Sequence, residues 1–473
     1  MQFLIPNRRT GWPMLAAAVF VAAIVTGCTG FATSGEKAAR KQAAASAQTY
    51  RPNGRKPELP KLTPESSLSN FLEFAMLNQP KVEIAYNDWM ASIERITQAR
   101  SLPDPQFTYQ MDIQDVVTSI MPGVLAAIPW PAKLKAAASQ ATAESQSRFY
   151  AFQSAALQNA FEVKRAYYQL HYLSDKIRVN QDMLSLLNRL EALASAENQA
   201  GKVTLQDVLR AQIEQGRVRV EIANLEDSRS SLLAQFKAAL GLGPADPDPP
   251  APARFDSTPT NIDLAAVLGA ALAQNTRLKS LAADVQAAEA ALMMAEKSKL
   301  PDFSLGLMAD AKMSPTLYRP LGTVSLPIWR DKIAARIAEA QADKKSAQAR
   351  LSDDQIALAV DIAERAYVYR ESTRNLGLLN EELLPKARQS FQMAQSSYLS
   401  GTMDIFNFTD TQRTLLRFEL DRVDAESQRE IVLAELSLIV QGMPPAGTSM
   451  AGARPASMNR LNPAANPAQA GGM

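Results

Sequence analysis

The sequence LPDPQFTYQMDIQ at residues 102–114, with its counterpart LPDFSLGLMADAK at residues 300–312, decides the fold. After each Leu-Pro-Asp, apolar and polar side chains alternate, as in Phe107-Thr108-Tyr109-Gln110. Period-two alternation indicates a strand with one apolar and one polar face. A run of roughly ten residues suits a tilted strand that crosses a bilayer, although a half-buried strand of a soluble sheet has the same pattern.

A partner strand is expected after each of these segments. Residues 323–328 alternate in the same way, whereas residues 123–128 do not. We therefore expect two pairs of short strands, with 123–128 the least regular.

The two segments belong to a tandem repeat with an offset of about 200 residues. Besides Leu-Pro-Asp, three pairs of matches keep the same order along the chain: Ile128-Pro129-Trp130 with Leu326-Pro327-Ile328-Trp329, Ala166-Tyr167 with Ala366-Tyr367, and Gly201 with Gly401. Collinear matches argue for duplication. The predicted repeats are residues 62–243 and 261–442, joined by a Pro-rich linker at 244–260.

Very long helices follow each strand pair. No proline occurs from Ala132 to Gly243, which permits uninterrupted helix because proline breaks helix interiors. Gly201 predicts a turn between two helices of about 65 residues, each reaching on the order of 100 Å. The second copy repeats this with Gly401 as its turn and Pro385 as a kink. Such helices suit a coiled-coil hairpin.

The N-terminus has the form of a secretory signal: Arg8 and Arg9 precede an apolar run and then Val25-Thr26-Gly27-Cys28. This end resembles the bacterial lipoprotein box, in which the cysteine is lipidated; a cleaved signal with a chance cysteine is the alternative. We expect a signal peptide at 1–27, a flexible lipidated tether at 28–61 and a disordered tail at 443–473.

Composition excludes several function classes. The chain carries a net charge of +2, which argues against nucleic-acid binding. One histidine, His171, and one cysteine, Cys28, cannot assemble a zinc site or a Cys/His catalytic pair. No enzyme activity, metal site or cofactor is expected, apart from the covalent lipid on Cys28.

Short strands that lead into long hairpins, twice in tandem after a lipoprotein signal, resemble the TolC-type outer-membrane factors, the outer membrane efflux protein family. The resemblance covers about residues 62–442. It implies a mainly α protein with a membrane β-barrel, in which a homotrimer builds a 12-stranded barrel on an α-helical tunnel. It also implies an exit duct in the outer membrane, with a periplasmic adaptor and an inner-membrane pump as partners in efflux or type I secretion.

The same resemblance implies roles for residues at the hairpin ends. Asn407 and Asp410 match the positions that narrow the periplasmic aperture. Asp207 and Tyr398 match a polar latch that holds the tips shut, although Met403 replaces the family's arginine. The adaptor would meet the tips at Gly201, Lys202, Gly401 and Thr402.

Two other functions remain open from the sequence. The chain could be a structural envelope lipoprotein of the same fold without an open pore. It could also be a periplasmic adaptor, although adaptors carry one hairpin and compact β-domains.

Overall fold

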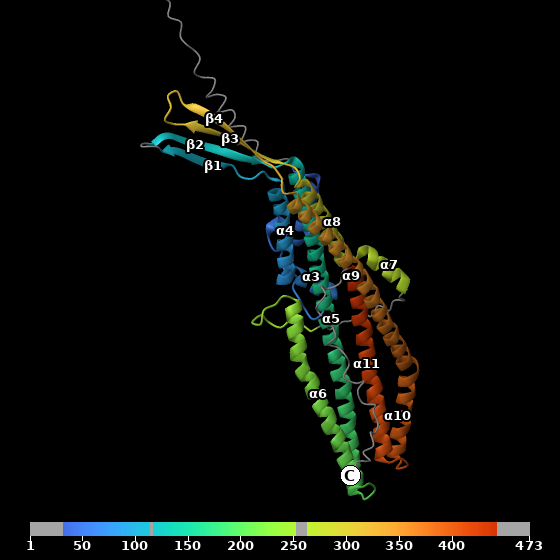
Figure 1. Ribbon diagram of the computed structural model, residues 1–473. Helices are drawn as coiled ribbons and strands as arrows, with labels where there is room; N and C mark the ends of the chain where they lie inside the picture. The colour runs from blue at the N-terminus through green and yellow to red at the C-terminus, as the bar shows by residue number, and fades with distance from the viewer. Residues whose placement is uncertain (1–31, 114–116, 252–262, 442–473) are drawn as a thin grey trace, which may run out of the picture. The chain divides into compact units, whose positions relative to one another are not determined.

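The computed structural model describes residues 32–113, 117–251 and 263–441, all within a unit that runs from Met1 to Met443 (Figure 1). The expectation of a mainly helical fold is confirmed. Two helices, two strands, a long helix and a returning helix follow one another, and this order then recurs. The first set is α3 (Leu68–Asn78), α4 (Pro80–Arg100), β1 (Gln106–Ile113), β2 (Val117–Ile128), α5 (Pro131–Gln199) and α6 (Leu205–Ala239).

The second set contains one additional interruption. Its elements are α7 (Leu264–Gln274), α8 (Thr276–Lys297), β3 (Asp302–Asp310), β4 (Leu317–Ser325), α9 (Arg330–Leu378), a π-helical turn (Leu379–Leu383), α10 (Leu384–Leu399) and α11 (Ile405–Gln441). The expected linker is described only as far as residue 251, and the expected tail lies outside the described residues, as does Cys28.

The expected flexible tether is wrong for residues 34–50, which form helix α2 (Ser34–Tyr50) ahead of a short 3₁₀ turn, Pro52–Gly54. Its alanines favour helix, and the Thr33 hydroxyl caps its start by accepting a hydrogen bond from the Glu36 backbone N–H at 3.1 Å. At the other end Tyr50 is 1% exposed, with its ring 4.9 Å from that of Tyr86 on α4. Both ends are therefore held in place.

A buried carboxylate ties α2 to the end of α4. Glu36 is 1% exposed and accepts hydrogen bonds from Arg100, from Thr97 at 2.7 Å and from Arg40 at 3.2 Å. Burial alone raises the pKa of Glu36, but the hydrogen bonds from Arg100, Thr97 and Arg40 outweigh it and lower the pKa to about 2. The segment is thus anchored beside the junction of α4 and β1.

The strands form one antiparallel sheet in the order β1-β2-β3-β4. The central pair joins the two sets of elements, because β2 pairs with β3 from Gly123↔Met308 to Ile128↔Phe303. Strand existence was predicted correctly, but two boundaries were not. β2 begins at Val117, and β4 covers residues 317–325 instead of 323–328.

Proline and glycine explain the error in β4. Pro320 and Gly322 occupy its apolar face, so the alternation is visible only from residue 323 onward. Within one chain β4 is an outer strand of the sheet, the position where proline is tolerated best. Past Ser325, Pro327 prevents the strand from continuing toward Ile328.

The long helices differ from the expected equal pair. α5 has 69 residues, close to the prediction, but α6 has only 35. Beside Pro385, where a kink was predicted, the helix contains a five-residue π-helical turn that ends two residues before the proline, at Leu383. A wider turn accommodates a proline ring and its missing N–H within an otherwise continuous helix.

The helices lie side by side, and each packs against the next (Figure 1). Near the sheet α4 contacts α5, α5 contacts α8, and α8 contacts α9. Farther along, α6 contacts α5, α5 contacts α11, and α11 contacts α9 and α10. The largest aromatic core lies between α2, α4 and α5, where Trp89 is 1% exposed and stacks on Phe152 at 5.8 Å.

Glycines with positive φ follow three helices, and two of them, Gly201 and Gly401, are the turns predicted from the sequence. Gly201 and Gly401 follow α5 and α10 with φ near +72° and +73°, and Gly241 follows α6 with +73°. In each case the next residue's N–H bonds back to a carbonyl five residues earlier, as in Lys202 to Glu197 at 2.9 Å. This pattern closes helix C-termini and produces the turns at both hairpin ends.

We expect Gly241→Ala to destabilise the protein by about 2–4 kcal/mol, and Gly201→Ala by only about 1–2 kcal/mol. Both impose a left-handed φ on alanine, but a Cβ at 241 would lie 2.8 Å from the Asn78 carbonyl oxygen, whereas nothing lies within 4 Å at 201. Thermal unfolding of the two variants measures the difference. Equal losses would contradict the tight contact between α6 and α3.

Candidate functional site

One face of the sheet is apolar throughout. The register aligns the apolar side chains of neighbouring strands: those of β1 with those of β2, those of β2 with those of β3, and those of β3 with the side chains of β4 on the same face. Phe107 is 73% exposed and Leu305 60%. The remaining exposed apolar side chains on this face are Tyr109, Met111, Val124, Ile128, Phe303, Leu307, Tyr318 and Val324. A contiguous exposed patch of this kind marks a surface that contacts something other than water.

The opposite face of the sheet carries the charged groups. Asp310, 2% exposed, accepts a hydrogen bond from the Ser119 hydroxyl at 2.8 Å and lies 3.9 Å from Arg319. Gln110, Asp112 and Thr323 share this face by register. The charged side chains of the strands are thus confined to one face, as the alternation in 102–114 and 300–312 predicts, although this face also carries apolar side chains: Met121, Leu125, Met308, Leu317 and Leu321.

The outer strands leave their outer backbone edges unpaired. β1 pairs only with β2, and β4 only with β3, among the described residues. Their lengths, from 8 to 12 residues, match those of strands that cross a bilayer. An open edge beside an apolar face is unstable in lipid unless another strand pairs with it.

The sheet is fixed to the helices at the first residue of β3. Asp302 pairs with Lys133 at 2.7 Å and accepts a hydrogen bond from the Trp130 backbone N–H at 3.2 Å. The Trp130 ring lies 6.0 Å from that of Phe303. The acid of the second Leu-Pro-Asp segment thus lies at the start of the first long helix, α5.

The two hairpin ends pack against each other through an apolar cluster. It combines side chains of all four helices that reach the tips: Leu190, Ala194, Val208, Ala211, Ala394, Tyr398, Ile405 and Phe408. The Tyr398 and Phe408 rings stack at 5.3 Å. Met403, at the position where the family's arginine was expected, packs against this cluster. The residue at the position of the family's arginine therefore makes an apolar contact at the tips.

The predicted tip residues lie at these ends, but the predicted latch pair is not bonded within one chain. The Asp207 carboxylate accepts hydrogen bonds from the backbone N–H and the hydroxyl of Thr204, at 2.9 and 2.8 Å. This capping box starts α6. The Tyr398 hydroxyl is buried with no hydrogen-bond partner in the described chain, and burial raises its pKa to about 12.

The other predicted residues are exposed. Asn407 and Asp410 lie in the first turns of α11, and the Asp404 side chain accepts the Asn407 backbone N–H at 2.7 Å. Gly201, Lys202, Gly401 and Thr402 form the two turns. No contact here tests their expected roles toward an aperture or an adaptor.

Sequence reasoning missed an ion pair between the hairpins. Arg413 on α11 donates two hydrogen bonds to Glu214 on α6, one from Nε at 3.1 Å. The hydrogen bond to Glu214 is the main cause that raises the pKa of Arg413. Nearer the tip, the Arg210 guanidinium lies 5.2 Å from the centre of the Phe406 ring. Glu214 and Arg413 lie about 200 residues apart, at matching positions of the two repeats, and only this match could have suggested the pair. Each side chain alone resembles an ordinary solvent-exposed charge on a helix.

We expect Tyr398→Phe to leave stability unchanged or to raise it by up to about 1 kcal/mol, because the lost hydroxyl is buried without a partner. Thermal unfolding of the purified protein measures this, with Phe408→Ala as a destabilising comparison from the same cluster. A loss larger than about 1 kcal/mol would mean that the hydroxyl is bonded in the assembled protein, as the latch expectation requires.

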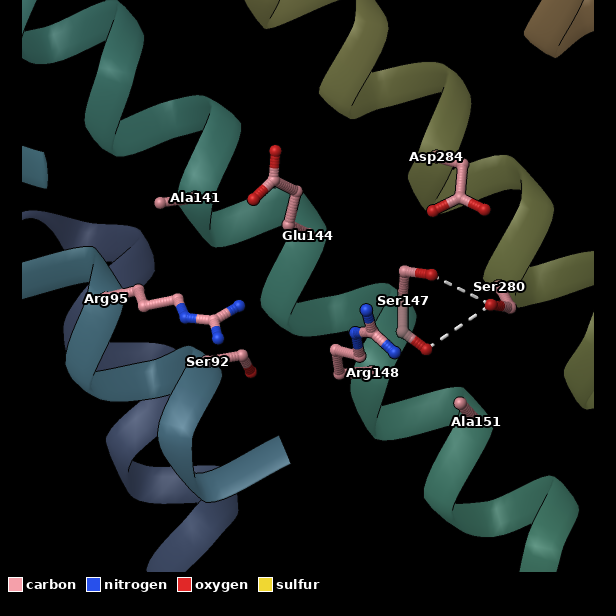
Figure 2. A pocket seen from close by; sticks show the side chains of 9 residues that line it. All are labelled: Ser92, Arg95, Ala141, Glu144, Ser147, Arg148, Ala151, Ser280 and Asp284. Carbon is pink, nitrogen blue, oxygen red and sulfur yellow. Dashed lines mark hydrogen bonds between the residues drawn. The ribbon is translucent and has the colours of Figure 1, made fainter. Parts of the chain in front are cut away.

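Figure 2 shows a pocket of about 370 Å³ between α4, α5 and α8. Arg95 and Arg148 line it together with Glu144 and Asp284, so its formal charges balance. Ser147 and Ser280 bridge α5 and α8 at 2.9 Å. This balanced, polar lining does not define a ligand.

No other site chemistry emerges from residues 32–113, 117–251 and 263–441. They contain no group of three or more His, Cys, Asp or Glu side chains that could hold a metal ion. His171 lies 3.9 Å from Asp175 and against the Tyr172 ring. None of the described helices is both long and apolar enough to cross a membrane.

Solved structures define the class of fold. The chain is 16% identical to the outer membrane protein VceC from Vibrio cholerae, with a TM-score of 0.68 over 79% of this chain and 96% of that one. It is 14% identical to the open state of the MtrE outer membrane channel from Neisseria gonorrhoeae, with a TM-score of 0.68 over 82% and 97%. The fold is that of outer-membrane channel proteins.

Sequence comparison points to the same class. Residues 267–440 match the family model described as outer membrane efflux protein. The chain is 25% identical over 271 residues to the cobalt-zinc-cadmium resistance protein CzcC from Cupriavidus metallidurans, a match that covers 54% of this chain. It spans 61% of that curated relative's length. The resemblance to the TolC-type outer-membrane factors is confirmed.

Proposed function

We propose that this chain is an exit duct of the outer membrane, which conducts substrates from a periplasmic adaptor and inner-membrane pump to the exterior. The observation that carries the proposal is the sheet, with its exposed apolar face, charged opposite face and unpaired edges. An apolar outer face against lipid and a polar inner face against water describe a transmembrane β-barrel wall.

Three copies close this wall. Each chain contributes four strands, so a trimer gives a 12-stranded barrel in which β4 of one copy pairs with β1 of the next. Closure removes every unpaired edge from the bilayer, which one four-stranded sheet alone cannot do.

The helices support the same assembly. α6 and α9 lie at opposite edges of the helical layer, and each exposes an apolar stripe at helical spacing. On α6 it comprises Leu205, Leu209, Ile213 and Val220; on α9 it comprises Ile356, Val360, Tyr367 and Leu378. Contacts with neighbouring copies would bury each stripe at its own level, because the stripe on α6 begins four residues after Gly201 and the stripe on α9 ends 23 residues before Gly401. The resulting tunnel is roughly 100 Å long, the reach of α5.

The proposed organisation keeps the predicted segments: a signal peptide at 1–27, a lipidated N-terminus at Cys28, and duplicated units at 62–243 and 261–442. Glu36, only eight residues after Cys28, is fixed beside the start of the sheet. Eight extended residues span at most about 28 Å, so a lipid on Cys28 would reach the bilayer around the barrel.

At the far end, the turns at Gly201-Lys202 and Gly401-Thr402 would meet the adaptor. Asn407 and Asp410 would line the aperture, with one carboxylate per chain. Both side chains are exposed near the tips, which supports this assignment. The two-hairpin fold also argues against the alternative of an adaptor.

The name of the relative CzcC makes cobalt, zinc and cadmium ions the first substrates to test. Deleting the gene from its host should sensitise cells to one of these ions, and the intact gene should restore resistance. Drugs, dyes and secreted proteins are tested in parallel. If no compound of any of these classes is affected, the channel role is contradicted and the structural-lipoprotein alternative gains support.

A further inference from the structure

Apolar side chains continue past the end of β4 as far as the start of α9. Leu326 is 67% exposed, Ile328 65% and Trp329 72%. The counterpart of Trp329 in the first repeat, Trp130, is only 37% exposed, and its ring lies 6.0 Å from that of Phe303. Trp329 is therefore the most exposed indole in the part of the chain that the structure describes, and it directly precedes α9.

Exposed cations follow this apolar segment at once. They lie in the first two turns of α9 and at the end of the neighbouring helix α8, and we call them the basic band: Arg330, Lys332, Arg336, Lys297 and Lys299. Within the described residues, none of the five forms an ion pair, unlike Lys133, which Asp302 neutralises nearby. The charges of the band are therefore available to an external partner.

The two halves of the basic band lie at the same level. α8 and α9 are antiparallel neighbours, and Lys344 on α9 pairs with Glu289 on α8 at 3.0 Å. Eight residues nearer the sheet on each helix are Arg336 and Lys297. The whole band thus lies within roughly 10 Å of the start of α9, measured along the helix.

The band concentrates positive charge. Two exposed acids, Glu296 and Asp331, lie among its five cations, so three positive charges remain in excess in each chain. The whole chain carries a net charge of only +2. An excess of this size beside exposed apolar side chains is the pattern of proteins that bind an anionic lipid surface.

The place of the band in the fold agrees with such a surface. β3 and β4 begin and end beside it, with Asp302 paired to Ser325, and their apolar face continues into Leu326, Ile328 and Trp329. Tryptophan favours the level of the headgroups, because its ring is apolar and its N–H needs a polar partner. A second copy packed on the band would have to supply acids for all of its cations, since burying unpaired charges is costly.

We propose that Trp329 and the basic band bind anionic phospholipids of the leaflet that surrounds the helical end of the barrel. The inference rests on the proposed exit-duct function, which places the sheet in the bilayer. The cations contact the phosphates, and Leu326 and Ile328 contact the acyl chains. The surface therefore selects phosphatidylglycerol over zwitterionic phosphatidylethanolamine, since each Lys or Arg near an anionic surface strengthens binding by roughly fivefold.

The test measures quenching of tryptophan fluorescence in the full-length protein, reconstituted in vesicles of equal parts phosphatidylglycerol and phosphatidylethanolamine. Two samples differ only in which lipid carries brominated acyl chains, which quench a tryptophan that they touch. The signal of Trp329 is the difference between the wild type and Trp329→Phe. Brominated phosphatidylglycerol should quench it roughly five times more strongly than brominated phosphatidylethanolamine. High salt should reduce this preference, because exposed charges are screened.

Arg330→Gln with Lys332→Gln should bring the ratio of the two quenching constants below about two. Lys345→Gln with Arg350→Gln is the matched control. It removes the same two kinds of charge from exposed positions of α9, but about 20 Å farther from the sheet. This control should keep the preference of the wild type. If both double variants behave alike, or if the two lipids quench Trp329 of the wild type equally, the band does not select anionic lipid and the proposal is wrong.

Leu305→Trp in the Trp329→Phe background separates the lipid site from the duct itself, because Leu305 lies on the apolar face of the sheet. If the Leu305→Trp side chain is quenched but Trp329 is not, a neighbouring copy covers Trp329, so the lipid site is wrong and the duct stands. If neither lipid quenches the Leu305→Trp side chain, the barrel wall is contradicted, and the lipid site with it.

Discussion

Leu305→Arg should prevent assembly of the trimer in the outer membrane. Leu305 lies midway along β3 on the apolar face and is 60% exposed in the single chain. If this face meets lipid, an arginine there destabilises the inserted barrel by about 2–4 kcal/mol in each copy, and the trimer contains three such arginines. The variant should be degraded or recovered from the periplasm, which membrane fractionation and native electrophoresis measure.

Ser304→Arg is the matched control, because Ser304 is the neighbouring residue on the charged face of the sheet. In a water-filled barrel the new arginine would point into the lumen, so the trimer should form and only its ion selectivity should change. If both variants assemble equally well, the apolar face does not meet lipid and the barrel is contradicted.

Glu36→Gln should destabilise the protein by about 3–5 kcal/mol, because it leaves the Arg100 guanidinium, 13% exposed, without its ionic partner. Glu94→Gln is the control. Glu94 pairs with the same Arg40 but its side chain is 62% exposed, so the loss should stay within about 1 kcal/mol. Thermal unfolding in detergent compares the two. A small effect at Glu36 would mean that α2 does not anchor the N-terminal segment.

The same carboxylate predicts how stability depends on pH. Its pKa is about 2 in the folded protein and 4.5 as the ordinary value, so its contribution is present above pH 4.5 and is lost as the pH falls toward 2. The shift corresponds to about 3 kcal/mol. Glu36→Gln should therefore remove much of the acid sensitivity between pH 5 and 2, and an unchanged acid profile would contradict the assignment.

Local patterns predicted the elements of this fold well. Alternation after each Leu-Pro-Asp found β1 and β3, the absence of proline found α5, and Gly201 and Gly401 found both turns. β4 was misplaced because Pro320 and Gly322 interrupt the alternation that defines a strand. Residues 34–50 were misjudged because composition describes a tether and a helix equally well until a buried partner, here Arg100 for Glu36, decides between them.

The candidate site was harder to predict because it depends on contacts between distant segments. The tip positions followed from the family resemblance, and the structure does place them at the hairpin ends. The contact partners did not follow, since the apolar cluster around Tyr398 and the Glu214–Arg413 pair join residues about 200 positions apart. One sequence does not reveal which exposed helix charges meet across two hairpins.

The most direct test of the central claim is the symmetry of the full-length protein, extracted in detergent and imaged by electron microscopy. We predict a threefold particle in which a β-barrel continues into a helical tunnel roughly 100 Å long. A monomeric particle, or a compact one without a tunnel, would contradict the exit duct.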